Sequence, residues 1–267
     1  MTDGGTSGSD STGTLTGERS GFADVNGVHM YYELHGQGTP LVLLHGGMLT
    51  VDLNFAGLIP SLSRSRLVIG VEMQGHGRTG NIDRPITMAA LADDIVGLLD
   101  HLEIDSAHVL GHSMGAGVTL ELAIGHPTRV RSIVPISASV RPDGMHEDLT
   151  DPAKMATSTR MPTPQDFADF RDAYLRLSPH PDQFDAFLGI LSSANGGLQG
   201  WSDEQLAGIT APTLLIIGDH DFVTIEHAAL MKQLIPGSRL AVLPNTTHMT
   251  ATRQTDLLLP MLTAFLD

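Results

Sequence analysis

Residues 111–115 read Gly-His-Ser-Met-Gly, which places a serine between two glycines. The apolar segment His108–Leu110 precedes the motif, and a helical pattern rich in Ala and Gly follows from Met114 to Ile124. A G-x-S-x-G motif between a strand and a helix is the setting of a nucleophile elbow, in which the serine hydroxyl projects from a strained turn. The spacing therefore predicts Ser113 as a nucleophile.

A serine hydroxyl needs a base to take its proton, and in strand–turn–helix folds of this kind the histidine follows the acid in the chain. Six histidines lie after Ser113. Only His248 falls between a late predicted strand (Leu240–Leu243, with a loop over residues 244–247) and the last predicted helix (Thr255–Leu266). That position leaves its side chain free to reach the edge of a sheet, so we predict His248 as the general base.

Two carboxylates in the segment Gly218-Asp219-His220-Asp221 are candidates for the acid that orients the base. The segment follows a predicted strand, and ligand sites of parallel sheets lie at the carboxyl ends of their strands. Asp219 is so close to the strand end that it can simply brace the turn. We therefore favour Asp221, with Asp219 second and Asp143 third.

A tetrahedral intermediate also needs hydrogen-bond donors aimed at its oxyanion. The glycine-rich turn His45-Gly46-Gly47-Met48 follows the apolar run Leu41–Leu44. Such a turn can direct backbone N–H groups into the site. We predict that the amide of Gly47 and the amide of Met114, just after the serine, form the oxyanion hole.

Alternating strand and helix patterns indicate how these groups are positioned. Short, wholly apolar runs are typical of strands buried on both faces, and helical patterns lie between them. This alternation predicts an α/β fold with a parallel sheet covered by helices on both sides. The segments are an edge hairpin around Asn26-Gly27, strands at Leu41–Leu44, Leu67–Val71, His108–Leu110, Ile133–Ile136, Thr213–Ile217 and Leu240–Leu243, and helices at Met88–Leu102, Met114–Ile124, Ile225–Leu234 and Thr255–Leu266.

Composition divides the chain into three parts. Residues 1–20 are mostly Gly, Ser, Thr and Asp, which predicts a disordered tail. Residues 21–267 are predicted to form one α/β domain. Residues 141–206 interrupt its alternation with predicted helices at Asp166–Leu177 and Gln183–Leu191, and an insertion of this length usually carries function.

Charge and residue usage exclude several classes of function. The chain has 267 residues, 30 of them acidic and 15 basic, for a formal net charge of −15. A chain this acidic repels phosphate backbones and anionic lipid, so nucleic acid and membranes are not expected partners. It has no cysteine, which excludes disulfides, thiolate nucleophiles and cysteine-ligated metals. No metal-ligand pattern or membrane span is evident, so we expect no cofactor and a cytoplasmic location.

Five features occur in an order that resembles the α/β-hydrolase family, over a stretch from about Phe22 to Leu266. They are the turn at 45–47, a Gly-His-Gly-Arg segment at 75–78, the serine motif at 111–115, the acidic motif at 218–221 and the late His248. The resemblance implies an eight-stranded, mostly parallel sheet with a helical cap over the serine.

The same resemblance implies a role for each candidate residue. Ser113, Asp221 and His248 would form the triad, and Gly47 and Met114 would donate to the oxyanion. The family's acid is usually the fourth residue of its motif, which supports Asp221. The segment at 75–78 is usually structural, so no catalytic role is expected for its residues.

Departures from the family's motifs reduce the number of reactions that this chain is expected to catalyse. Ser113 argues against epoxide hydrolases and haloalkane dehalogenases, which have Asp at the elbow. Carbon–carbon bond hydrolases usually carry Ser-Gly-Pro-Gly after the His-Gly, where this chain has Gly47-Met48-Leu49. Cofactor-free perhydrolases often carry an aromatic residue in place of Gly47.

These observations predict a serine hydrolase that cleaves small to medium, mostly apolar carboxylic esters through an acyl-enzyme. A lactonase, thioesterase, amidase or carbon–carbon bond hydrolase with the same triad, or a hydrolase-like small-molecule receptor, are the alternatives. Most basic residues of the insertion are expected to be solvated, although they could bind a substrate carboxylate; they include Arg141, Arg160, Arg171 and Arg176.

Overall fold

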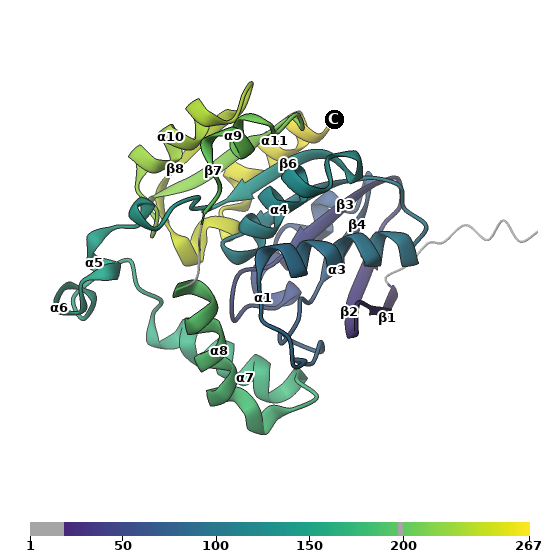
Figure 1. Cartoon of the computed structure of the whole chain (residues 1–267), viewed down its shortest axis with the longest axis horizontal. Helices are drawn as coiled ribbons and strands as arrows, with labels where there is room; N and C mark the ends of the chain where they lie inside the picture. Colours follow the sequence, from purple (N-terminus) through teal and green to yellow (C-terminus); the bar gives the residue numbers. More distant parts are fainter. Residues whose placement is uncertain (1–18, 197–199) are drawn as a thin grey trace, which may run out of the picture.

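The computed structural model describes residues 19–196 and 200–267, which build an eight-stranded sheet with helices on both faces (Figure 1). The strand order is β1-β2-β4-β3-β5-β6-β7-β8, antiparallel from β1 to β4 and parallel from β4 onward. The predicted fold class is therefore confirmed. The strands are β1 (Arg19–Val25), β2 (Val28–His35), β3 (Thr39–Leu44), β4 (Arg66–Val71), β5 (Ala107–His112), β6 (Val130–Ile136), β7 (Leu214–His220) and β8 (Arg239–Thr247).

The helices follow the predicted alternation with the strands. They are α1 (Val51–Phe55), α2 (Ile59–Leu62), α3 (Met88–His101), α4 (Met114–Gly125), α5 (Glu147–Thr150), α6 (Pro152–Met155), α7 (Pro164–Leu177), α8 (Phe184–Gly196), α9 (Asp203–Ala207), α10 (Ile225–Leu234) and α11 (Thr255–Leu266). Short 3-10 helices are η1 (Pro127–Arg129), η2 (Pro142–Gly144), η3 (Pro181–Gln183) and η4 (His248–Arg253).

Strand β3 shows why the central runs are wholly apolar. Leu41 and Leu43 pack in a core with residues of α1, α2 and α11, whereas Val42 and Leu44 pack on the opposite face with residues of α3 and α4. Side chains alternate across a strand, so both sets are removed from water only when helices cover both faces. The carboxyl end of β3 is thereby held at the sheet edge that carries the candidate site.

The edge hairpin forms as its sequence predicts. Asn26 and Gly27 join β1 to β2 with φ of 47° and 85°, the conformation that an Asn-Gly turn favours. Strand β1 begins at Arg19, so the last two residues of the segment expected to be disordered belong to the sheet. The remainder of that segment, residues 1–18, lies outside the described residues.

Strand β8 is longer than predicted. Residues 244–247, interpreted as a loop, extend the strand to Thr247, which pairs with His220 after a register shift. The side chain of Asp219 explains the extension, because it accepts hydrogen bonds from the amides of Asn245 (3.0 Å) and Thr246 (2.9 Å). Strand pairing therefore continues up to His248.

The segment between β6 and β7 is helical, as predicted, and Figure 1 shows α7 and α8 beside each other at one side of the sheet. The Thr163 side chain caps α7 in a reciprocal arrangement with Asp166. Asp166 also binds Arg253 of η4 (3.2 Å), and Trp201 Nε1 donates to Glu121 of α4 (2.6 Å). These contacts tie the helical segment to the sheet domain.

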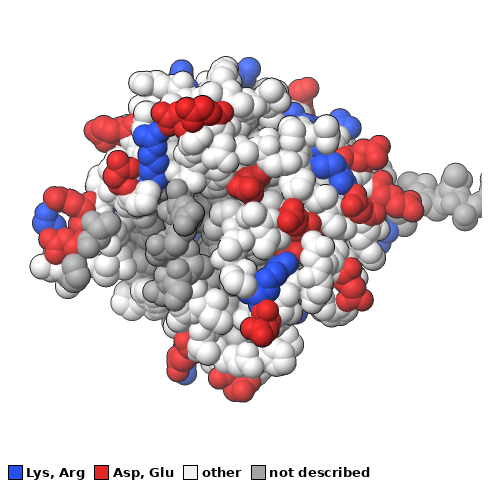
Figure 2. All heavy atoms as spheres, viewed as in Figure 1, with Lys and Arg blue, Asp and Glu red and all other residues white. Residues whose placement is uncertain are grey.

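Acidic side chains spread over the face in Figure 2, with fewer basic ones among them. Across residues 19–196 and 200–267, no helix has the length and apolar character needed to cross a membrane. Within the same residues, no group of three or more histidine and acidic side chains is placed to hold a metal ion.

Candidate active site

Ser113 stands at the sharp turn between β5 and α4. Its backbone has φ of 54° and ψ of −114°, a conformation that costs a non-glycine residue about 1–3 kcal/mol. The two flanking glycines make the turn possible. A Cβ on Gly111 would lie 2.1 Å from the carbonyl oxygen of Gly115, and a Cβ on Gly115 would lie 2.1 Å from that of Leu44. The strain presents the partly exposed serine hydroxyl above the sheet.

Gly115→Ala should lower the free energy of unfolding by at least ~2 kcal/mol, because its methyl group would press on backbone that cannot yield. Gly47→Ala is the matched control: a Cβ there meets nothing within 4 Å, and we expect a change within ~0.5 kcal/mol. Urea denaturation measures both. Equal stability of the two variants would contradict this account of the turn.

The structure brings Ser113, His248 and Asp221 into one hydrogen-bonded chain. His248 begins η4, directly after β8. Its Nε2 lies 2.8 Å from Ser113 Oγ, and its Nδ1 lies 2.7 Å from Asp221 Oδ1. With the proton on Nδ1, the imidazole donates to the carboxylate and can accept the serine proton.

Asp221 is fully buried, and its carboxylate is surrounded by donors. Oδ1 accepts from His248 and from the amide of Phe222 (2.7 Å), and Oδ2 accepts from the hydroxyl of Ser137 (2.5 Å). Burial raises the pKa of Asp221, but the charge of His248 and these hydrogen bonds outweigh it and bring the pKa to about 2. The group is an anion at neutral pH, suited to stabilise a protonated imidazole.

The two other candidate acids lie elsewhere. Asp219 turns toward the end of β8, where it binds backbone amides and His220. Asp143 lies in η2, and the imidazole of His248 makes its side-chain hydrogen bonds to Asp221 and Ser113 instead.

The predicted oxyanion donors flank the serine. The Met114 amide is the first of α4, where N–H groups have no intrahelical partner. Among the described residues, the amides of Gly47 and Met48 donate to no protein acceptor. Asn54 Oδ1 holds this turn by accepting from the Gly46 amide (2.8 Å). The open amides can therefore bind an oxygen of a substrate.

Three residues that sequence reasoning missed support the imidazole. Ser137 binds Asp221, and the ring of Phe222 stacks on that of His248 with centroids 4.0 Å apart and planes 7° apart. His112 Nε2 lies 3.0 Å from the carbonyl oxygen of His248, to which it can donate. Each lies within one residue of a motif or strand end, but only its position in space reveals the contact.

Buried histidines should make the protein sensitive to acid. Burial lowers the pKa of His45 far below its usual value, that of His76 to about 4 and that of His112 to about 3. Below pH 6.5 these three histidines are protonated in the unfolded chain but stay neutral in the folded protein. Glu72 opposes them, since burial raises its pKa to about 7 and the folded chain keeps one more proton there.

These four groups alone give a net difference of about two protons, so they should lower the free energy of unfolding by roughly 3 kcal/mol per unit as pH drops from about 6 to 4.5. Urea titrations at several pH values measure this slope. Glu72→Gln should steepen it by about one proton, because it removes the opposing group. A flat profile between pH 6 and 4.5 would contradict neutral burial of the histidines.

An apolar cavity of about 530 Å³ opens over Ser113; we call it the active-site cavity. Its size is that of a small-molecule site. Its described lining contains no aspartate, glutamate, lysine or arginine and consists mostly of methionine, phenylalanine and leucine. It comprises Gly46, Gly47, Met48, Leu49, His112, Ser113, Met114, Met155, Met161, Pro162, Phe167, Phe170, Leu188, Leu191, Phe222, His248 and Met249.

None of the four arginines considered for a substrate carboxylate lines the active-site cavity. Arg141 pairs with Asp203, and Arg160 donates to the backbone oxygen of Asp221 (3.1 Å). Arg171 and Arg176 are exposed on α7. Among the described residues that line the active-site cavity, there is thus no guanidinium group to bind an organic anion.

Comparisons with known proteins show the fold family of the chain. A family model described as the alpha/beta hydrolase fold matches residues 39–183. One relative is the dihydrolipoyllysine-residue acetyltransferase component of the acetoin cleaving system of Cupriavidus necator. It is 29% identical to this chain over 241 residues, which cover 85% of this chain. The match spans only 64% of that relative's length. A protein of Azorhizobium caulinodans, provisionally named a carbamate hydrolase, is 28% identical, with 91% of this chain and 97% of the relative covered.

A solved structure is similar over nearly the whole chain. The meta-cleavage product hydrolase of Pseudomonas fluorescens IP01 superposes with a TM-score of 0.74 at 25% identity. The match covers 91% of this chain and 95% of that one.

Proposed function

Because the chain belongs to the alpha/beta hydrolase fold family, we propose that it is a serine hydrolase that cleaves carboxylic esters of small to medium, mostly apolar molecules. One observation carries the proposal: Ser113, His248 and Asp221 form a hydrogen-bonded chain beneath an apolar cavity. A buried carboxylate, an imidazole and an accessible hydroxyl in this order are the parts that acyl transfer needs.

In the proposed mechanism, Ser113 Oγ attacks the ester carbonyl carbon while His248 Nε2 takes the serine proton. The carbonyl oxygen becomes an oxyanion that the amides of Gly47 and Met114 bind. Collapse breaks the bond to the alcohol, which leaves with the proton from His248, and an acyl-enzyme remains. Water then attacks with His248 as base, releasing the acid and restoring Ser113.

The helical segment 141–206 would act as a cap in this mechanism. It contributes Met155, Met161, Phe167, Phe170 and Leu188 to the cavity, all apolar. A cap of this kind excludes water from the acyl group and favours hydrophobic substrates. Its methionines suit ligands of varied shape, since the side chain is flexible and polarisable.

Hydrolysis of a different bond by the same residues is the second candidate, since the relatives include proteins named for a carbamate and for a meta-cleavage product. The described cavity lining contains no lysine or arginine, which argues against substrates that carry a carboxylate. Met48 and Leu49 also follow Gly47 where carbon–carbon bond hydrolases usually continue a glycine-rich turn. We therefore rank esters first.

A matched substrate panel tests the assignment. Straight-chain p-nitrophenyl esters from acetyl to octanoyl are compared with an amide, a carbamate, a lactone and a vinylogous diketone of similar size. We expect the highest kcat/KM on a medium-chain ester, with a burst of p-nitrophenol equal to the enzyme concentration. Preference for any other bond type would replace the ester assignment. Ligand binding without turnover of any member would favour a receptor.

A further inference from the structure

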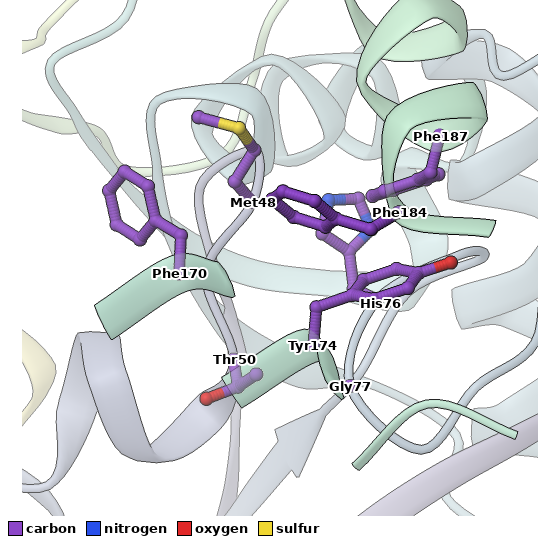
Figure 3. Close-up of a pocket in the computed structure, with 8 residues that line it drawn as sticks. All are labelled: Met48, Thr50, His76, Gly77, Phe170, Tyr174, Phe184 and Phe187. Carbon is purple, nitrogen blue, oxygen red and sulfur yellow. The ribbon is translucent and has the colours of Figure 1, made fainter. Parts of the chain in front are cut away.

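A second, much smaller cavity lies beside the active-site cavity, and the two share Met48 and Phe170 as walls. Figure 3 shows it, with the rings of Tyr174, Phe184 and Phe187 near His76 and that of Phe170 farther away, beyond Met48. Its volume is about 10 Å³, roughly the space that one water molecule or one hydroxyl group requires. We call it the His76 cavity.

His76 is one of the walls of this cavity and carries one unsatisfied polar atom. Its Nδ1–H donates to the carbonyl oxygen of Gln74 at 3.0 Å. A neutral imidazole then carries a lone pair on Nε2, and this atom is buried with no hydrogen-bond partner among the described residues. A buried acceptor without a donor is destabilising, so a partner that reached it would be stabilising.

The ring of His76 cannot turn to find a partner elsewhere. It packs against the ring of His45 (centroids 4.7 Å apart) and edge-on against that of Phe187 (4.9 Å). A Cβ on Gly75 would lie 2.3 Å from the Phe187 ring, so the backbone is also close-packed there. The acceptor is thus fixed, and its partner must come to it.

Met48 is the movable wall between the two cavities. It follows Gly47, whose amide faces the proposed oxyanion, so a substrate held there extends past Met48. A methionine side chain has three rotatable bonds, so it can fill a gap in the free protein and move aside when a ligand occupies that space. A chain end that displaces Met48 enters a space that is lined by aromatic rings and by His76.

We propose that the His76 cavity is a subsite for a neutral hydrogen-bond donor, a hydroxyl group at the far end of an otherwise apolar substrate, with His76 Nε2 as its acceptor. The proposal rests on the proposed function, since it places the reacting carbonyl at Ser113. No described residue of the subsite is acidic or basic apart from His76, which favours an alcohol over an ion. His76 is here a specificity residue and takes no part in proton transfer.

A pair of esters that differ in one group tests the subsite: a hexanoate p-nitrophenyl ester and its analogue with a terminal hydroxyl. We expect the wild type to prefer the hydroxylated ester in kcat/KM by about 10-fold, and His76→Leu to lose that preference. Tyr174→Phe, at the same cavity, keeps the acceptor and should keep the preference. The acetyl ester has no chain end to place in the His76 cavity and should be cleaved equally by wild type and His76→Leu. An equal ratio in both proteins would overturn the proposal.

A binding measurement separates this proposal from the ester assignment, because it needs no turnover. In Ser113→Ala protein labelled with ¹⁵N-histidine, the Nε2 resonance of His76 is identified by its loss in the double variant with His76→Leu. It should shift when the hydroxylated ester is added and stay in place with the plain ester. A resonance that ignores both, or responds equally, would mean that the cavity holds water only. If His76→Leu folds poorly, the kcat/KM ratio of the two esters in the wild type and in Tyr174→Phe still tests the proposal, because no preference for the hydroxylated ester would overturn it.

Discussion

Ser113→Ala is expected to lower kcat by at least about 10⁴-fold, since the variant cannot form an acyl-enzyme. The residual rate would come from the oxyanion donors and the cavity alone. Alanine keeps the backbone conformation of the turn, so the thermal midpoint should change little. The measurement is kcat on the best ester, together with intact-mass spectrometry after exposure to a fluorophosphonate. The wild type should gain one adduct and the variant none.

Ser139→Ala is the matched control for this experiment. Ser139 lies just after β6, and its hydroxyl donates to the backbone oxygen of Arg141 (2.7 Å) rather than to the triad. It should retain near-wild-type turnover and still take the adduct. If Ser113→Ala keeps more than about 1% of wild-type kcat, or still takes the adduct, another residue is the nucleophile.

Asp221→Ala should be nearly as severe, with kcat falling on the order of 10⁴-fold. His248 would lose the acceptor that fixes its tautomer and the anion that stabilises its protonated form. The hydroxyl of Ser137 and the amide of Phe222 would also lose their acceptor, so some stability should be lost as well.

Asp219→Ala separates the two acids of the motif. Asp219 binds the amides of Asn245 and Thr246, so its loss should destabilise the end of β8 by about 1 kcal/mol and leave kcat within about tenfold. Kinetics and urea denaturation on both variants make the comparison. A larger loss of kcat from Asp219→Ala than from Asp221→Ala would reverse their roles.

The two acids show what local sequence can and cannot decide. Asp219 lies near the end of β7 and Asp221 comes directly after that strand, and both carry a pKa lowered to about 2. The structure separates them by burial and direction: Asp221 is buried against His248, whereas Asp219 points to the exposed turn of β8. Position relative to the strand end favoured Asp221 but could not show these contacts.

Predictions based on periodicity succeeded because they depend on short-range physics. Wholly apolar runs, an Asn-Gly turn and helical spacing are local properties of the chain, and they located the sheet and its helices. The end of β8 was predicted wrongly, because its pairing depends on a side chain of β7, 26 residues earlier. A bond of that kind leaves no pattern in the strand that it extends.

The sequence by itself determined the fold class, the turn at Ser113 and the order in which the candidate nucleophile, acid and base follow one another along the chain. The flanking glycines and the strand ends that indicate these features each lie within a few residues of one another. Only the tertiary structure decided which side chains meet. The stacking of Phe222 on His248, the bond from Ser137 to Asp221 and the unsatisfied nitrogen of His76 arise where separate segments pack together. Such contacts depend on the closure of long loops and on the shape of the packed core, which no single stretch of residues specifies.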